Sequence, residues 1–212
     1  MEQEKITVYL DVDDTVLQSS EAIIKILNKK HNIQPPKKIE DLKDWRYASI
    51  YNEITPDEVE SIYASDEFFD VVNIDEVFSQ FFYKSLEKVN FVFVTKGTSD
   101  NLNKKEKYLR KRLNGPFDYV GLTFTDKEEC LNSRNFDKKA VNMRYGIHID
   151  DRIECLKTTN APVKILLKKH GVHYWNENYA GIPNLYVTNT WEEAIQIVEF
   201  AYTEHYIFKK CN

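Results

Sequence analysis

KITVYLDVDDT, residues 5–15, is an apolar run that ends in a cluster of carboxylates. Most of its first six residues are β-branched or aromatic, which predicts a buried strand over 5–10. Asp11 and Asp13 follow directly. Because residues two apart at a strand end lie on the same face, the two carboxylates are expected to be near each other. Their charges repel unless a cation lies between them. A hard divalent cation would relieve that repulsion, so we expect one beside them.

The rest of the chain repeats this pattern of a strand followed by polar or helix-forming sequence. Further strands are expected at 90–95, 119–124, 146–150 and 163–167, with a weaker one at 185–188. Helical periodicity is found at 101–113, 151–159 and 190–203. This alternation predicts an α/β fold with a parallel sheet of about five strands flanked by helices. Ligands of such sheets bind beyond the carboxyl ends of the strands.

One long stretch breaks the alternation. Residues 18–88 show helical periodicity at 20–30, 55–65 and 74–88 but no convincing strand. We therefore expect a small helical cap inserted after the first strand and lying over the carboxyl ends of the sheet. The core domain would comprise residues 1–17 and 89–212, and the cap domain residues 18–88.

Length and composition are those of a folded protein. At ~150 residues per domain, 212 residues fit one core with an insertion. The chain is 42% hydrophobic and 30% charged, which excludes the disordered and low-complexity classes. Its net charge of −5 argues against general nucleic-acid binding. No apolar run reaches the ~18 residues of a membrane helix, and no signal peptide is evident. We expect a cytoplasmic protein without membrane contact, and a homodimer stays open.

Polar residues follow two other expected strands. Thr95 and Lys96 offer a hydroxyl and backbone N–H groups suited to anionic oxygens. Asp150 and Asp151 form a second carboxylate pair, which could also cap a helix starting near Arg152. A lysine is available from the loop before this pair. A metal, an aspartate nucleophile and anion donors at one sheet edge indicate phosphoryl transfer.

In these residues the chain resembles the haloacid dehalogenase superfamily of aspartate-nucleophile phosphatases. Four motifs match: DVDDT at 11–15, VT at 94–95, a lysine within 127–139, and IDD at 149–151. The resemblance implies a Rossmann-like core with a cap of the first type. It also implies Asp11 as nucleophile, Asp13 as general acid and base, and Thr95 as a phosphate ligand. Asp150 would hold Mg²⁺ with Asp11 and the backbone carbonyl of Asp13.

The lysine of the third motif has three candidates. Lys138 lies 12 residues before Asp150, and Lys127 lies 23 residues before it. We favour Lys138 as the catalytic lysine, because the family places this residue shortly before the strand that carries the acidic pair. Lys127 and Lys139 remain alternatives.

Within the superfamily the chain resembles the 5′(3′)-deoxyribonucleotidase group, the C-type 5′-nucleotidases. The resemblance rests on Trp45, the run 67–78, Lys105 with Tyr108 and Leu109, HYWNEN at 173–178 and TWEEAI at 190–195. It implies a nucleoside monophosphate as substrate, with Trp45 and Phe69 as substrate-binding residues and Tyr47 as a further candidate. Lys96 is the third predicted substrate-binding residue, from its place after the strand 90–95. Gln18 and Lys96 depart from the group, which usually has an aspartate and a small residue there. The cap aromatics are equally expected in the core of the cap.

Two rival functions follow from the same residues. A phosphatase of this fold could act on a sugar phosphate or a polynucleotide 3′-phosphate. The acidic balance disfavours the polynucleotide, and we interpret the basic strip 104–112 as a solvated helix face. A non-catalytic ligand-binding protein of the same fold is the rival from another class. The presence of both Asp11 and Asp13 weakens it, since binding alone has no chemical need for the pair.

Overall fold

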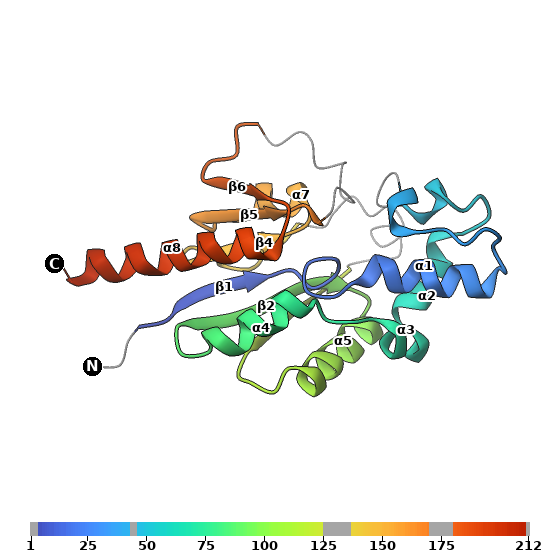
Figure 1. Cartoon of the computed structure of the whole chain (residues 1–212), viewed down its shortest axis with the longest axis horizontal. Helices are drawn as coiled ribbons and strands as arrows, with labels where there is room; N and C mark the ends of the chain where they lie inside the picture. Colours follow the sequence, from blue (N-terminus) through green and yellow to red (C-terminus); the bar gives the residue numbers. More distant parts are fainter. Residues whose placement is uncertain (1–3, 43–45, 125–136, 170–179, 211–212) are drawn as a thin grey trace.

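The fold is a six-stranded, all-parallel sheet with helices packed against it (Figure 1). The computed structural model describes residues 4–42, 46–124, 137–169 and 180–210, with side chains up to residue 204. The sheet order is β3-β2-β1-β4-β5-β6. The strands are β1 (Ile6–Leu10), β2 (Val89–Gly97), β3 (Asp118–Thr123), β4 (Gly146–Asp150), β5 (Val163–Leu167) and β6 (Leu185–Thr188). This confirms the predicted Rossmann-like α/β fold, and the weak sixth strand is part of the sheet.

β1 is a central strand, and its register determines which side chains meet. Leu10 lies beside Phe93 of β2 on one side and Ile149 of β4 on the other. The residues that follow β1 therefore emerge next to the carboxyl ends of both neighbouring strands.

Several helices begin where a side chain caps the first turn. Thr55, Ser65, Asp75 and Thr98 each accept a hydrogen bond from the N–H group three residues further on. The helices are α1 (Ser19–Lys30), α2 (Pro56–Tyr63), α3 (Asp66–Val71), α4 (Glu76–Ser85), α5 (Ser99–Arg112), α7 (Ile153–Thr158) and α8 (Trp191–Lys210), with short 3₁₀ turns η1 (Ile39–Asp41) and η2 (Tyr47–Ser49). In the described ranges, none of the helices combines the length and the apolar character needed to cross a lipid bilayer.

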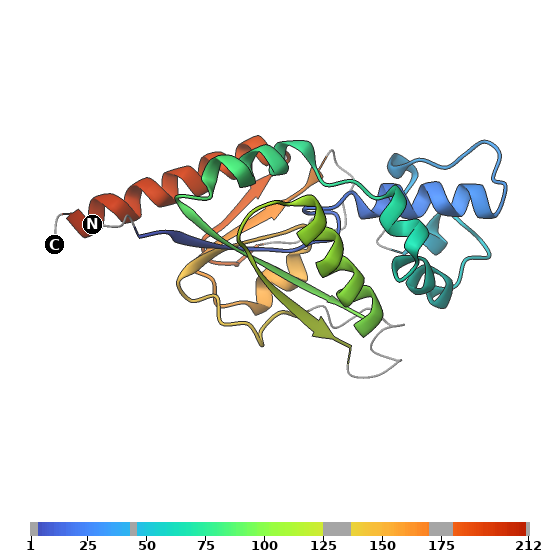
Figure 2. The ribbon, with the colours of Figure 1, turned by 90° about the horizontal axis from the view of Figure 1, so that it is seen from below.

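α4 packs on the sheet, although it falls within the range 18–88 expected for the cap. The Phe78 ring centroid lies 6.0 Å from that of Phe93 and 5.0 Å from that of Trp191 on α8. Figure 2 shows α4 and α8 together on one side of the sheet and α7 on the other. The cap boundary at residue 88 stays a prediction, and the packing of α4 favours an end before this helix.

α1, α2 and α3 project beyond the carboxyl ends of the strands (Figure 1). The two chain segments that join them to the sheet are hydrogen-bonded to each other. Gln18 N donates to Asn73 O at 2.9 Å, and Asp75 N donates to Val16 O at 2.8 Å. The insertion therefore leaves and re-enters the core at adjacent points.

The packing of α4 predicts a large cost for truncating Phe78. Phe78 is fully buried, so Phe78→Ala should lower the free energy of unfolding by ~3–5 kcal/mol through lost burial and the cavity left behind. The control is Phe200→Ala on α8, because Phe200 is 64% exposed. Urea denaturation measures both. Equal losses in the two variants would mean that α4 does not contribute to the core.

Candidate active site

The carboxyl ends of three adjacent strands bring the predicted residues together. Asp11 follows β1, Thr95 lies near the end of β2, and Asp150 is the last residue of β4. Because the strands are parallel and neighbours in the order β2-β1-β4, these ends share one edge of the sheet. Lys138 reaches the same edge from the segment before β4.

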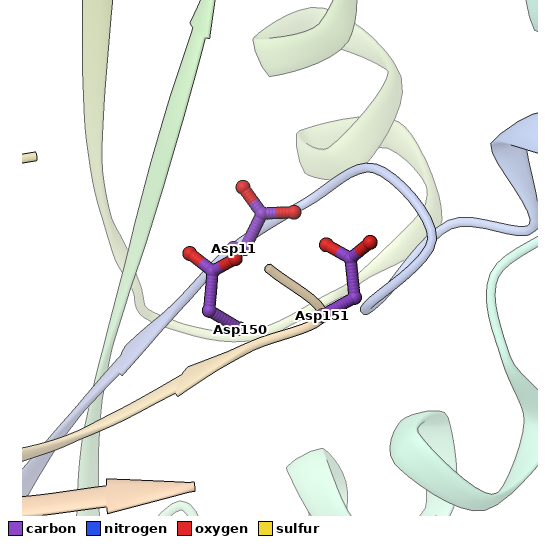
Figure 3. Close-up of side chains that lie close together, drawn as sticks. All are labelled: Asp11, Asp150 and Asp151. Atoms are coloured by element: carbon purple, nitrogen blue, oxygen red, sulfur yellow. The ribbon is translucent and has the colours of Figure 1, made fainter. Parts of the chain in front are cut away.

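Asp11, Asp150 and Asp151 form a compact acidic group (Figure 3). One carboxylate oxygen from each residue lies within 4.8 Å of the others. Asp150 and Asp151 are buried, while the Asp11 side chain remains 13% exposed and faces a pocket. The sequence analysis named Asp151 as part of a carboxylate pair but not as a ligand. Its position directly after Asp150 was the available signal.

Lys138 is the lysine that the structure places at the acidic group. Its side chain is 2% exposed, and Nζ lies 2.5 Å from Asp11 Oδ1 and 2.7 Å from Asp150 Oδ2. Lys139 points elsewhere: its side chain is 72% exposed and pairs with Asp137. Lys127 lies outside the described residues.

The acidic group holds more negative charge than Lys138 alone can balance. Burial raises the pKa of Asp11 to about 7, and the nearby carboxylates add to this while Lys138 opposes it. Burial and the neighbouring carboxylates also raise the pKa of Asp151 well above its usual value. Unbalanced charge and closely spaced oxygen donors are what a hard divalent cation such as Mg²⁺ requires. The residues therefore fit the predicted cofactor.

Asp13 turns its side chain away from the acidic group. Its Oδ2 lies 2.5 Å from Lys105 Nζ, and its Oδ1 accepts a hydrogen bond of 2.7 Å from Ser19 Oγ. Lys105 Nζ also donates to Thr95 Oγ1 at 3.0 Å. The Asp13 carboxylate is thus outside the acidic group, where Asp151 stands instead. A metal contact through the Asp13 backbone carbonyl stays a prediction.

Lys105 is the site residue that sequence reasoning misplaced. The interpretation of 104–112 as a solvated helix face is wrong for Lys105, which is fully buried. Lys105 lies three residues after Leu102 and four before Leu109, so it shares their buried face of α5. That helical phase was the signal in the sequence.

A pocket of about 220 Å³ lies over these groups and under the projecting helices. Its sheet side includes Asp11, Asp13, Thr95, Lys138 and Asp151. Its cap side includes Tyr47, Ile54, Val59 and Tyr63. The site therefore combines a charged floor with a cap wall of mainly apolar and aromatic residues, to which Arg46 and Glu60 add charge.

The three predicted substrate-binding residues have different positions. Lys96 lines the pocket. Phe69 is not among the lining residues, because its ring packs against Phe68 and Tyr108 at centroid distances of 5.0 and 5.6 Å. Trp45 lies outside the described residues. The further candidate Tyr47 does line the pocket.

Hydrogen bonds join the cap wall to the loop after β1. Tyr47 Oη donates to Ser20 Oγ at 3.1 Å and lies 3.3 Å from Tyr63 Oη. Ser20 in turn donates to the Asp14 carboxylate through both its backbone N–H group and its hydroxyl. Burial raises the pKa of both tyrosines well above the usual value, so the rings stay neutral. The orientation of the wall is therefore coupled to the loop that follows Asp11.

Comparison with known proteins identifies the fold. No family model and no curated protein matches the chain. Solved structures match over most of its length. A HAD family hydrolase from Deinococcus radiodurans, with bound phosphate and sodium, is 12% identical, with a TM-score of 0.56 over 94% of this chain and 98% of that one.

Two further solved structures agree. The magnesium-bound protein YfnB from Bacillus subtilis, described as a HAD-hydrolase, is 17% identical, with a TM-score of 0.54 over 92% of this chain and 98% of its own. A haloacid dehalogenase-like family hydrolase from Streptococcus pneumoniae is 13% identical, with a TM-score of 0.55 over the same shares. The structural neighbours of this chain are thus hydrolases of the haloacid dehalogenase superfamily, and the chain has their fold.

Proposed function

We propose that the protein is a Mg²⁺-dependent phosphomonoesterase that works through an aspartyl-phosphate. The observation that carries this proposal is the acidic group with Lys138, set beside Thr95 at one edge of the sheet. Binding alone does not require a partly exposed carboxylate to share one small site with a second, separately held carboxylate. Nucleophilic phosphoryl transfer requires both.

Asp11 and Asp13 take different steps in the proposed reaction. An Asp11 oxygen attacks phosphorus, an O–P bond forms, and the bond from phosphorus to the leaving oxygen breaks. Asp13 gives a proton to that oxygen and then takes one from the water that hydrolyses phospho-Asp11. The Lys105 and Ser19 contacts hold Asp13 apart from the acidic group, which supports its separate role. Bound Mg²⁺ would neutralise charge on Asp11 and on the phosphate.

The phosphate oxygens would lie between Thr95 and the two buried lysines. Thr95 Oγ1 and Lys105 Nζ are 3.0 Å apart, so one anionic oxygen can reach both. Lys138 flanks the other side of the nucleophile through its contact with Asp11. These donors are fixed before substrate arrives, which favours stabilisation of charge that develops in the transition state.

Asp11→Asn tests the reaction itself. The amide keeps the shape but lacks the nucleophilic charge, so hydrolysis of p-nitrophenyl phosphate with Mg²⁺ should fall to background. Asp118→Asn, at the exposed amino end of β3, is the matched control and should retain wild-type rates. Turnover by Asp11→Asn within tenfold of wild type would contradict the proposal.

Mg²⁺ binding should also be visible in thermal stability. Mg²⁺ at 100 times its Kd should stabilise the protein by ~2.7 kcal/mol. Burial and the neighbouring carboxylates oppose ionisation of Asp151, so at a pH where Asp151 is charged, Asp151→Asn should raise the Tm of the metal-free protein and reduce the gain from Mg²⁺. Thermal scans in EDTA and in Mg²⁺ measure both effects, with Asp118→Asn as control.

The acidic group would not be the cation site if Asp151→Asn gained as much from Mg²⁺ as the wild type.

For the substrate class we propose a nucleoside monophosphate. The cap wall offers the rings of Tyr47 and Tyr63 and the side chains of Ile54 and Val59, which suit a flat base, while Arg46 and Glu60 beside them supply polar groups for its edge or for the ribose. The proposal that Trp45 and Lys96 contact this substrate stands with it. Phe69 has no such support, because its ring is packed between α3 and α5.

Filling the cap side of the pocket tests this substrate class. Val59→Trp should lower kcat/KM for nucleoside monophosphates at least tenfold and change the rate with the small substrate acetyl phosphate by less than threefold. Ser61→Trp, on the exposed face of the same helix α2, is the control. Steady-state kinetics with nucleotides, sugar phosphates and acetyl phosphate decide the matter. Faster turnover of sugar phosphates by the wild type would overturn the nucleotide assignment and leave the phosphatase intact.

A further inference from the structure

A fully buried histidine lies directly behind the acidic group. His148 is 0% exposed and stands two residues before Asp150 on β4, so both side chains emerge on the same face of the sheet. His148 Nε2 lies 3.3 Å from Asp150 Oδ2. On the other side of the ring, Nδ1 lies 3.2 Å from Thr159 Oγ1.

The position is an unusual one for an imidazole. The strand residues on either side, Ile147 and Ile149, are buried hydrophobic residues. Burying a polar ring costs free energy unless its nitrogens are satisfied. Within the described part of the chain, Nε2 has no well-aligned hydrogen-bond partner, and the Asp150 carboxylate is the acceptor in its reach. Nε2 therefore depends on Asp150 for its polar contact.

The geometry favours one tautomer of the ring. An unprotonated Nε2 would turn its lone pair toward the Asp150 carboxylate, whereas an Nε2–H group can donate to it. With the proton on Nε2, Nδ1 can accept a hydrogen bond from the Thr159 hydroxyl, which also lies 3.4 Å from Leu156 O.

Asp150 is held from three directions. Oδ2 faces Lys138 Nζ at 2.7 Å as well as His148 Nε2, and Oδ1 accepts a hydrogen bond of 2.9 Å from Arg152 N. A carboxylate oxygen has two lone pairs, so Oδ1 keeps one for a cation. Lys138 brings a positive charge that a bound cation must tolerate. His148 contacts the same oxygen from the buried side of the sheet.

We propose that His148 is a positioning residue that fixes the Asp150 carboxylate as a metal ligand and thereby sets the affinity for Mg²⁺. The inference rests on the proposed function, since it assigns the acidic group to a divalent cation. Groups that orient a metal ligand typically change affinity by ~10–100-fold when they are removed.

Calorimetric titration of the whole protein with Mg²⁺ tests the proposal without any substrate. His148→Phe keeps the ring shape and loses both nitrogens, so it should weaken Mg²⁺ binding at least tenfold. His148→Gln retains an N–H donor and should bind within threefold of wild type. Tyr9→Phe is the control: Tyr9 lies beside His148 on β1, but its hydroxyl donates to Asn142 O, away from Asp150. It should leave the affinity unchanged.

Thr159→Val supplies a second test should His148→Phe fail to fold. Loss of the hydroxyl releases the ring, so Mg²⁺ affinity should fall by at least threefold while the free energy of unfolding stays near that of Tyr9→Phe. The imidazole ¹⁵N shifts of the wild type should report a protonated Nε2 and an unprotonated Nδ1. Wild-type affinity in Thr159→Val, or the opposite tautomer, would overturn the proposal.

The outcomes separate this inference from the proposed function. Equal Mg²⁺ affinity in wild type and His148→Phe overturns the role of His148 alone, as does a His148→Gln variant as weak as His148→Phe. A wild type that binds Mg²⁺ with the expected variant pattern but hydrolyses no phosphomonoester overturns the proposed activity and supports the role of His148. A wild type that does not bind Mg²⁺ overturns both.

Discussion

Repulsion among carboxylates at one edge of the sheet is the constraint that organises this molecule. The parallel order of β2, β1 and β4 brings the acidic group and Asp13 to the same edge, beneath the cap. Such charges cannot be buried together without cations. Two lysines that arrive from different segments, Lys105 on α5 and Lys138 before β4, meet this requirement, and both are almost fully buried. Much of the surrounding structure holds these two ammonium groups in place.

The two lysines divide the charge unequally. Lys105 pairs with a single carboxylate, that of Asp13, and also donates a hydrogen bond to the neutral hydroxyl of Thr95. Lys138 is shared between Asp11 and Asp150, with Asp151 beside them. The shortage of positive charge therefore falls on the acidic group rather than on Asp13. This asymmetry explains how aspartates at one site could have different roles under the proposed function. The acidic group would bind a cation, and Asp13 would transfer a proton.

Local pattern predicted the sheet well because each strand is a β-branched or aromatic run that ends in polar residues. The pattern could not predict where α4 packs, because an apolar helix face looks the same whether it covers a sheet or lies in a cap. In the structure, Phe78 of α4 packs against Phe93 of the sheet. Lys138 was selected because the resembled family places its lysine shortly before the strand that carries the acidic pair. Lys105 was named only in support of the resemblance, and its burial was obscured by the neighbouring lysines and arginines of α5. Phe69 shows the same limit: adjacent aromatic residues on α3 give no sign of which ring faces a pocket.

The paired segments at the root of the cap bear on how such a molecule can change over evolution. The insertion starts and ends one hydrogen bond apart, at Gln18 and Asn73. The length and sequence of the chain between these two points do not affect how the strands are connected. The entropic cost of closing such an insertion also rises only slowly with its length. The cap wall of the pocket can then be lengthened, shortened or exchanged while the strands and their charged edge stay as they are. Under the proposed function, the part of the chain that contacts the substrate can therefore vary in sequence and length independently of the part that carries the reaction.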